Sequence, residues 1–430
     1  MSLARARIIP AVFAVLGSLL ALSPSFANDG TIAFVGATII DGTDAEPLAD
    51  GVLVITDGRI LTVGPRDAVT IPAGADVVDV SGKYIMPGLI NAHGHVGATI
   101  GLNGNGGYTT GNLLRQLGLY ARYGITAVNS LGGDAEQGFE LRSTQYDKDL
   151  NRARIYVAGG VVVGDSEQAI RNEVNRNADR GVNFIKVRID DNLGATQKMP
   201  RPLFDALVDQ AHIRRLPVAV HLFYLDDAKY MLNADADLIA HSIRDLPVDN
   251  ELIDLVKEKD VCYIPTLTRE VSTFVYESVP DFFSDPYFLK EVEPAILDEL
   301  KTPERMSRMA SSRSAQGYKA ALQVAMANVG ALDDAGVRIA MGTDTGPPAR
   351  FQGYFEHMEM HMMVDAGMSP LDAIRSSTGV AADCIGMGDI GTLEPGKWGD
   401  FSILTENPAA DILNTKTIES VYIAGNQVPD

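Results

Sequence analysis

Cysteine and tryptophan are nearly absent from this chain. It has 2 cysteines and 1 tryptophan among 430 residues, and aromatic residues make up 7%. Two cysteines exclude both a small domain built on many disulfides and a zinc site built on cysteines. Cys262 falls in an apolar stretch and Cys384 in a late helical stretch. We therefore expect two buried free thiols, with a disulfide between them as the alternative.

Positive charge is also scarce. The chain carries 36 Lys and Arg against 56 Asp and Glu, a formal net charge of −20. Binding to nucleic acid depends on cationic groups that neutralise phosphates, so this balance argues against a nucleic-acid partner. We expect a small-molecule substrate, and a homo-oligomer stays possible.

Only one long apolar run is present, and it lies at the N-terminal end. Arg5 and Arg7 precede the apolar residues 8–22, and a small-x-small sequence ends at Ala27. This order is typical of a secretory signal peptide. We expect residues 1–27 to be cleaved and the protein to be periplasmic or secreted; an uncleaved anchor is the alternative. Once the signal is removed, no remaining run is long enough to form a stable membrane span.

The rest of the chain changes character twice. Residues 28–84 and 396–430 contain short apolar strands separated by turns, whereas residues 85–395 alternate apolar runs with helical stretches. Such alternation is typical of a parallel sheet covered by helices. We expect an α/β fold: a metal-dependent (β/α)₈ TIM barrel over 85–395 and a small composite β-sandwich domain built from both termini. The expected barrel strands are 85–93, 125–130, 155–161, 184–189, 217–221, 238–241, 261–266 and 337–343.

Helical stretches separate these strands. The segment 269–335 is too long for a standard crossover, so we expect it to add helices over the active-site face. The other expected helices include 113–123, 167–179, 201–215, 226–234, 250–259, 355–366 and 370–377.

Polar residues close or interrupt several of the expected strands. His93 and His95 end the first one, and residues two apart on a strand point to the same side. Four further apolar runs contain or end in a polar residue where a core would favour an aliphatic one, at Lys186, His221, His241 and Asp344. Taken singly, each could be a satisfied core or rim residue. Because a barrel gathers strand ends around one pocket, we expect all six to form one site.

Several motifs together resemble the amidohydrolase superfamily. They are His93-Gly94-His95 after the segment 86–92, the segment 124–128, Gly342-Thr343-Asp344 and the tail 391–400. The similarity covers nearly the whole chain beyond the expected signal peptide. The strand with Lys186 is similar to the prolidase-like branch, which is related to the imidazolonepropionases and has a carboxylated lysine.

The resemblance implies a centre of two divalent metals, Zn²⁺ or else Mn²⁺ or Co²⁺. It places His93, His95 and Asp344 on one metal, His221 and His241 on the other, and carboxylated Lys186 between them. In that chemistry a metal-bridging hydroxide attacks a carbonyl. Asp344, as the catalytic residue, takes the proton and passes it to the leaving nitrogen.

The expected substrate contacts follow the fifth, sixth and seventh strands. Arg244 and Arg269 would bind a substrate carboxylate, and Tyr224 would polarise the scissile carbonyl. Exposed arginines and a packed tyrosine are the alternatives. His357 and His361 are four apart in a helical stretch but lack the glutamate of the zincin motif, so we expect them at the pocket rim or in packing.

The sequence therefore favours an exported metal-dependent hydrolase of a carbon–nitrogen bond, acting on a dipeptide or an N-acyl amino acid. A lactone or ester hydrolase using the same metals is the alternative within enzymes. A non-catalytic exported binding protein is another, although it would need neither a bridging lysine nor a proton-carrying Asp344. The order Leu222-Phe223-Tyr224 after His221 departs from the small residue and tyrosine that many members of the family have there, which leaves the substrate open.

Overall fold

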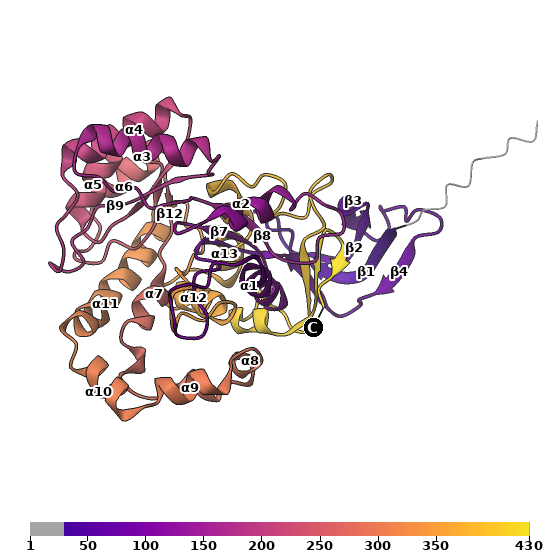
Figure 1. Cartoon of the computed structure of the whole chain (residues 1–430). Coiled ribbons are helices and arrows are strands. Elements are labelled where there is room, and N and C mark those ends of the chain that lie inside the picture. Colours follow the sequence, from indigo (N-terminus) through magenta and orange to yellow (C-terminus); the bar gives the residue numbers. More distant parts are fainter. Residues whose placement is uncertain (1–29, 430) are drawn as a thin grey trace, which may run out of the picture.

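The protein has two parts, a β-rich domain and a barrel. The computed structural model describes residues 30–429, so the expected signal peptide at 1–27 lies outside the described residues. Strands β1–β4 lie at one end of the molecule beside the C-terminal strands, and helices α3–α6 lie at the other end (Figure 1). Among residues 30–429, no helix combines the length and apolar character needed to cross a bilayer. The predicted partition at residues 84 and 396 stays a prediction.

Both ends of the chain build the β-rich domain, as expected. Its strands form one sheet in the order β15-β14-β13-β5-β1-β2-β3, and β4 also pairs with β1. Phe34, Leu53, Ile85 and Phe401 from four of these strands form its buried core. The bounds are β1 Thr31–Ile39, β2 Leu48–Thr56, β3 Arg59–Pro65, β4 Asp76–Asp79, β5 Tyr84–Pro87, β13 Phe401–Leu404, β14 Ile418–Ile423 and β15 Asn426–Gln427.

The barrel is closed by parallel pairing all the way round. β6–β8 pair in parallel, as do β9–β12. Single bridges join Val162 to Val187, Tyr263 to Ile339 and Gly94 to Thr345, so that the segment 337–345 takes the eighth strand position. The bounds are β6 Leu89–Gly94, β7 Ile125–Ser130, β8 Arg154–Val157, β9 Ile185–Arg188, β10 Val218–His221, β11 Leu238–Ile239 and β12 Cys262–Tyr263.

The expected first barrel strand, 85–93, is two strands. β5 belongs to the β-rich sheet and β6 to the barrel, and the chain passes between them at Gly88. A Cβ atom at Gly88 would lie 2.1 Å from Oγ1 of Thr126, so only glycine fits this crossing. The apolar run is continuous because both strands are buried.

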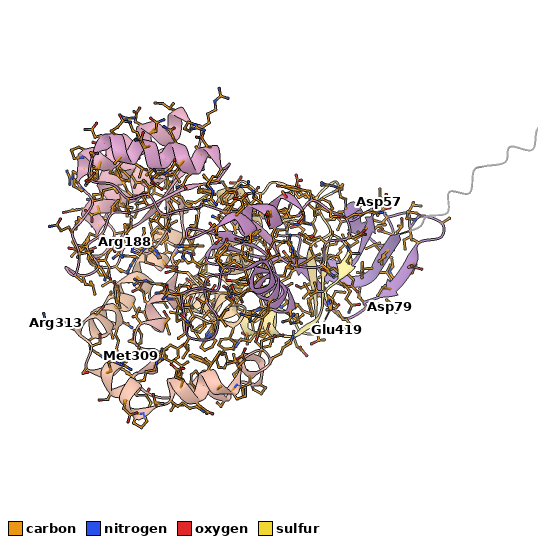
Figure 2. All side chains as sticks on the ribbon, viewed as in Figure 1. Asp57, Asp79, Arg188, Met309, Arg313 and Glu419 are labelled. Carbon is orange, nitrogen blue, oxygen red and sulfur yellow. A yellow bond between two sulfur atoms is a disulfide. The ribbon has the colours of Figure 1, made fainter. Side chains whose placement is uncertain are left out.

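The helices lie largely where the sequence predicts them, and the segment after β12 adds several more. Met309 and Arg313 mark this inserted helical layer in Figure 2, whereas Asp57, Asp79 and Glu419 lie at the β-rich end. The predicted bounds of α3 are confirmed, and α2 was not predicted. The bounds are α1 Thr110–Arg122, α2 Glu136–Ser143, α3 Glu167–Asp179, α4 Arg201–Ile213, α5 Leu225–Asn233, α6 Asn250–Glu258, α7 Leu267–Ser272, α8 Pro286–Leu289, α9 Pro294–Leu300, α10 Pro303–Ala310, α11 Arg313–Asp334, α12 Tyr354–Asp365, α13 Pro370–Ser376 and α14 Gly379–Cys384, with 3₁₀ turns at Val275–Glu277, Asp281–Ser284 and Ile412–Lys416.

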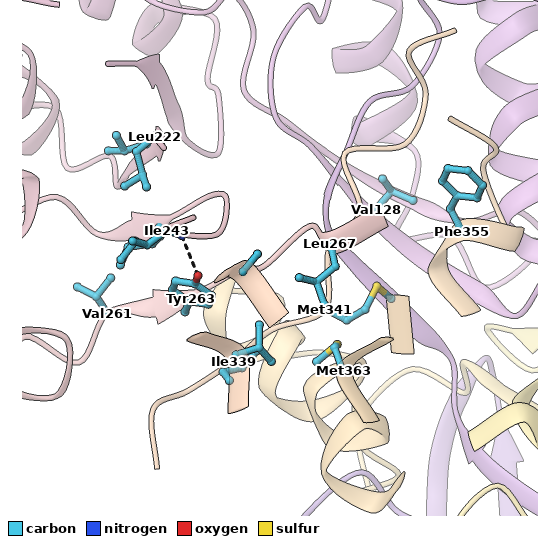
Figure 3. Close-up of a cluster of buried hydrophobic side chains, with 14 of the residues drawn as sticks. Val128, Leu222, Ile243, Val261, Tyr263, Leu267, Ile339, Met341, Phe355 and Met363 are labelled. Carbon is cyan, nitrogen blue, oxygen red and sulfur yellow. Dashed lines mark hydrogen bonds between the residues drawn. The ribbon is translucent and has the colours of Figure 1, made fainter. Parts of the chain in front are cut away.

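The core under the mouth of the barrel joins strands to α12. Figure 3 shows Tyr263, Ile339, Met341 and Met363 together, and the Tyr263 hydroxyl accepts a 2.9 Å hydrogen bond from the backbone N–H of Ile243. The core that contains Tyr263 therefore extends to Ile243, two residues after the predicted ligand His241.

A buried ion pair fastens the barrel to the β-rich domain. Arg154 on β8 donates from Nε and Nη2 to the two carboxylate oxygens of Asp400 at 2.7 and 3.0 Å. Asp400 also accepts from the backbone N–H of Ala424 at 2.7 Å. A bidentate pair with this third donor satisfies a charge that would otherwise be costly to bury.

The expectation of two free thiols is wrong. Cys262 on β12 and Cys384 at the end of α14 form a disulfide, with their Cα atoms 5.9 Å apart. That separation is within the usual range for a disulfide. The sequence could not show that a strand and a helix 122 residues apart meet at the base of the barrel.

We predict that removing this disulfide destabilises the fold. It closes a loop of 122 residues, for which chain entropy sets a loss of up to about 5 kcal/mol in the free energy of unfolding. The Cys262→Ser, Cys384→Ser variant and the wild type in dithiothreitol should unfold at the same lowered temperature, followed by circular dichroism. An unchanged unfolding temperature together with two thiols titratable in the unreduced native protein would contradict the linkage.

Candidate metal centre

All six predicted ligands converge at the carboxyl ends of the barrel strands. His93 and His95 lie at the end of β6, Lys186 on β9 and His221 at the end of β10. His241 follows β11, and Asp344 lies in the eighth strand segment. Because the strands are parallel, these ends share one rim. Whether each residue binds metal stays a prediction; their proximity is observed.

One group of donors is compact. The ligand atoms of His93, His95 and Asp344 all lie within 4.8 Å of one another. Nε2 of His95 is 2.8 Å from Oδ1 of Asp344, and Nε2 of His93 is 3.8 Å from the same oxygen. The Nδ1 atoms face backbone carbonyls instead, at Ala240 (2.7 Å) and Gly132 (3.0 Å). Nδ1–H donation to these carbonyls leaves both Nε2 lone pairs directed at the group.

The remaining three predicted ligands lie against this group through His93. Nζ of Lys186 is 3.2 Å from Nε2 of His93. The His241 ring is 4.6 Å from the His93 ring, centroid to centroid, and 4.1 Å from the His221 ring. The site is thus one chain of contacts, with His93 between its two halves.

Hydrogen bonds also orient the second pair of histidines. Nδ1 of His241 is 2.8 Å from Oγ1 of Thr266, a residue in the left-handed region with φ 51°. Nε2 of His221 is 3.1 Å from Oδ2 of the buried Asp190, which also accepts from Nε of Arg188 at 2.7 Å. The orientation of each imidazole ring is therefore determined by a hydrogen-bond partner that follows a barrel strand.

Burial shifts Lys186 and three of the four histidines of the site towards their neutral forms. It lowers the pKa of His221 to about 3 and that of Lys186 to about 7, and it brings the pKa values of His93 and His241 well below the usual range. Burial alone would raise the pKa of Asp344, but its neighbours, the cationic Arg350 first among them, outweigh burial and hold that pKa well below its usual value. Neutral imidazoles beside a carboxylate fit a divalent cation such as zinc.

The three predicted substrate residues differ in how they face the site. Nε of Arg269 lies 3.9 Å from Oδ2 of Asp344, so this side chain reaches the metal group. Arg244 is fully buried; its Nη1 donates to the carbonyls of Leu222 (3.1 Å) and Ser242 (2.5 Å), which ties together the chain after β10 and after β11.

Tyr224 lies beside an acidic neighbour. Its hydroxyl donates to Oδ1 of Asp191 at 2.7 Å, and Nζ of Lys198 lies 3.8 Å from the centre of its ring. A contact from this hydroxyl to a carbonyl would require that bond to break.

The two histidines of α12 lie elsewhere. His357 is buried, with Nε2 2.8 Å from the carbonyl of Tyr123 and Nδ1 2.9 Å from Oγ1 of Thr415. The exposed His361 has Asp365 3.8 Å away. Their contacts are those of a packed residue and a surface residue.

Sequence reasoning missed two fully buried carboxylates one turn apart on α12. Glu356 accepts hydrogen bonds from Asn91 (2.7 Å), Thr343 (2.8 Å) and Thr345 (2.6 Å), and so joins β6 to the residues on both sides of Asp344. Nδ2 of Asn91 is the donor to Glu356, and Oδ1 of the same amide accepts from the backbone N–H of His93 at 3.0 Å.

Glu359 joins α12 in the same way to the start of α7, the segment that follows the seventh strand. It accepts from the backbone N–H groups of Leu267 (2.6 Å) and Thr268 (2.7 Å) and from the Thr268 hydroxyl (2.6 Å). Burial raises the pKa of Glu359 to about 8, against the effect of these donors. The only sequence signal was an apolar helix interrupted by glutamates at i and i+3.

Arg350 was also missed. Its Nη1 contacts Oδ2 of Asp344 and lies 3.3 Å from the backbone carbonyl of the same residue. It occurs in a loop whose sequence has no recognisable pattern.

We predict that Glu356 positions the metal ligands. The Glu356→Gln change turns one acceptor oxygen into a donor, which leaves a buried partner unpaired and loosens both strand ends. The dissociation constant of Co²⁺ for metal-stripped protein should rise roughly 10-fold or more, and the visible spectrum of bound Co²⁺ should change. His361→Gln on the same helix, at an exposed side chain, is the matched control. Wild-type affinity and spectrum in Glu356→Gln would show that Glu356 serves stability alone.

Solved structures with this fold are known. A Xaa-Pro dipeptidase with bound methionine superposes with a TM-score of 0.73 at 20% identity, covering 93% of this chain and 100% of that one. Ochratoxinase from Aspergillus niger has a TM-score of 0.71 at 21% identity, covering 93% and 95%. At these identities the likeness shows the fold, which confirms the predicted barrel with its β-rich domain.

Comparisons of sequence show the family. The same ochratoxinase is 24% identical over 449 residues, covering 90% of this chain and 83% of the relative. An uncharacterised protein of Mycobacterium tuberculosis is 28% identical over 225 residues, 50% of this chain, and the match spans 57% of that relative's length. A sequence model of the amidohydrolase family matches residues 84–428. The chain belongs to the amidohydrolase family.

Proposed function

We propose that the protein is an exported metal-dependent amidohydrolase that cleaves an amide bond in a small substrate, a dipeptide or an N-acyl amino acid. The observation that carries this proposal is the convergence of four histidines, a lysine and an aspartate on one rim of the barrel. A binding protein would need no such set. The names of the structural relatives, a Xaa-Pro dipeptidase and an ochratoxinase, support hydrolysis.

We assign two cations to the donor set. His93, His95 and Asp344 would hold the first, His221 and His241 the second, and Lys186, which touches His93, would lie between them. Bound there, divalent metals would polarise the scissile carbonyl and make water a nucleophile at neutral pH. Zn²⁺ suits these ligands, and Mn²⁺ or Co²⁺ is the alternative.

Asp344 would carry the proton. Its carboxylate is buried at the centre of the site, with one oxygen near the histidines and the other facing two arginines. A carboxylate so placed can take a proton from the attacking water and deliver it to the leaving nitrogen. During the reaction the group that exchanges a proton with Asp344 would change from the attacking water to the leaving nitrogen. The strand end keeps the carboxylate in one position throughout.

Lys186 would act as a carbamate. Its amine is buried, 3.2 Å from Nε2 of His93. Reaction with CO₂ joins Nζ to the carbon and releases one proton, which gives a group with two anionic oxygens able to bind both metals. A plain lysine has no such oxygen.

A substrate carboxylate would meet the arginines beside Asp344. Arg269 is buried, and among residues 30–429 its Nε has no hydrogen-bond partner, although Nη1 pairs with the buried Glu270 at 3.0 and 3.1 Å. A buried donor without a partner is uncommon and points to a ligand that supplies the acceptor. Arg350 adds a second cation on the same side of Asp344.

Export to the periplasm or the medium is part of the proposal. The sequence of residues 1–27 has the order of a signal peptide. The disulfide between Cys262 and Cys384 is independent support, because disulfides persist in oxidising compartments and are rare in the cytosol.

We predict that Lys186→Ala loses metal and activity together. Metal content of the purified variant should fall below that of the wild type, and short carboxylic acids should restore part of the activity by taking the place of the carbamate. Lys148→Ala, at an exposed lysine, is the matched control. Full metal content and wild-type turnover in Lys186→Ala would refute the bridging role.

We predict turnover of amides that carry a free carboxylate. Wild-type protein loaded with Zn²⁺ or Mn²⁺ in bicarbonate should hydrolyse members of a dipeptide and N-acyl amino acid library. It should act on them at least roughly 10-fold faster, in kcat/KM, than on the same compounds blocked as carboxamides, because these cannot pair with the arginines. Turnover of lactones or esters alone would contradict the proposed substrate class.

A further inference from the structure

The two histidines assigned to the second metal follow the last residues that pair their strands. β10 and β11 pair as far as Val220 and Ile239. His221 and His241 come after this point, so the pairing of the two strands stops before either imidazole. Their ring centroids are nevertheless only 4.1 Å apart. Contacts beyond the paired residues therefore matter for the distance between these two ligands.

Arg244 joins the two strand ends directly beyond the ligands. Its Nη1 donates to the carbonyl of Leu222 at 3.1 Å and to that of Ser242 at 2.5 Å. These carbonyls belong to the residues that directly follow His221 and His241. The backbone N–H of Arg244 also donates to the chain after β10, at 3.1 Å. One residue thus links positions next to both ligands.

The guanidinium of Arg244 is enclosed by protein. The side chain is fully buried, and its Cζ lies 4.8 Å from the centre of the Phe223 ring. The side chain of Arg269, in contrast, is 8% exposed and reaches Asp344. A substrate could touch Arg244 only after the groups around it move. Its Nη2 has no hydrogen-bond partner among residues 30–429, so a substrate contact is the alternative that the test must separate.

Glu270 supplies the countercharge that a buried guanidinium requires. Its Oε1 lies 3.1 Å from Nε of Arg244, and both its oxygens accept from Nη1 of Arg269, at 3.0 and 3.1 Å. A charge buried without a partner is costly, so this ion pair stabilises Arg244 in its position. Because Arg269 lies beside Asp344, Glu270 also connects the second pair of ligands with the first group.

We infer that Arg244 is a positioning residue for the second metal: it fixes the separation of His221 and His241 and makes no contact with the substrate. The inference rests on the proposed two-metal site and gives Arg244 a role other than the substrate contact predicted from the sequence. The histidines of the first metal are oriented by bonds that do not involve Arg244. Its loss should therefore weaken the binding of one cation and spare the other.

The test is a calorimetric titration of metal-stripped protein with Co²⁺ in bicarbonate. The wild type should bind two cations per chain. In Arg244→Met, Glu270 keeps Arg269 as a partner. One Co²⁺ should bind this variant with wild-type affinity, while the dissociation constant of the other rises roughly 10-fold or more. Arg313→Met, the same change at an exposed arginine on α11 (Figure 2), is the matched control and should bind both cations as the wild type does.

The position of the weakened cation is checked by anomalous diffraction from zinc-loaded Arg244→Met crystals. The peak at His221 and His241 should lose height relative to the peak at His93, His95 and Asp344. Wild-type affinity for both cations, or an equal loss for both, would overturn the positioning role. Two intact cations together with a raised KM for N-acyl amino acids would show that Arg244 contacts the substrate instead.

A second variant covers the case in which circular dichroism shows Arg244→Met to be unfolded. Arg244→Lys keeps a cation beside Glu270, but its nitrogen ends one bond short of Nη1. The dissociation constant of the second Co²⁺ should still rise roughly 3-fold or more, with the first unchanged. Equal affinities of Arg244→Lys and the wild type for the second cation would overturn the inference.

Counting cations also separates this inference from the proposed reaction. If the wild type binds two cations and Arg244→Met loses the second, but the wild type hydrolyses no amide, the proposed reaction is wrong and the positioning role stands. If the wild type hydrolyses amides and Arg244→Met binds both cations as tightly, the reaction stands and the positioning role is refuted. A wild type that binds only one cation would contradict the two-metal site and the inference together.

Discussion

The pairing of the eighth strand segment with β6 is the constraint on which the site depends. The backbone N–H groups of Thr343 and Asp344 both donate to the carbonyl of His93, at 3.0 and 2.7 Å, and the N–H of His95 donates to Thr345 at 2.7 Å. These bonds close the barrel and place a carboxylate from late in the chain beside two histidines from its beginning. Asp344 adopts a left-handed backbone, φ 56°, which aspartate tolerates better than most residues and which is common at functional sites.

Helix α12 makes this closure rigid. Glu356 and Glu359 are buried and form no ion pair within residues 30–429, and a carboxyl group is costly to bury unless hydrogen bonds replace its water. Donors from β6, from the eighth segment and from the start of α7 supply those bonds. The cost of taking these carboxyl groups out of water is offset only when all three segments are in place. The helix thus couples correct folding of the barrel to correct placement of the ligands.

Much of the fold followed from the sequence because its signals are local. Polar residues within or at the ends of apolar runs predicted six residues that the barrel does bring together, and the predicted helix 167–179 matches α3 to the residue. The inserted helices after β12 followed from the length of the connection. What the sequence could not show depends on packing between distant segments: the disulfide of Cys262 with Cys384, the crossing at Gly88 and the bond from Arg350 to Asp344.

The predicted metal ligands and the residues expected to contact the substrate come from different parts of the fold. The ligands project from strand ends, where backbone pairing determines their positions. Arg350 comes from the loop after the eighth strand segment and Arg269 from the segment that follows β12, and such connecting segments can change in sequence while the barrel stays intact. Proteins with this barrel can therefore keep the same strand-end positions and differ in the bond they cleave.

The convergence of the six residues on metal is most directly tested by anomalous diffraction at the zinc edge, from crystals grown with Zn²⁺ and bicarbonate. The account predicts two peaks, one at a coordination distance of about 2.0–2.2 Å from His93, His95 and Asp344 and the other likewise from His221 and His241, with Lys186 between them. The absence of any peak at these residues, or peaks only at surface acidic groups, would contradict it.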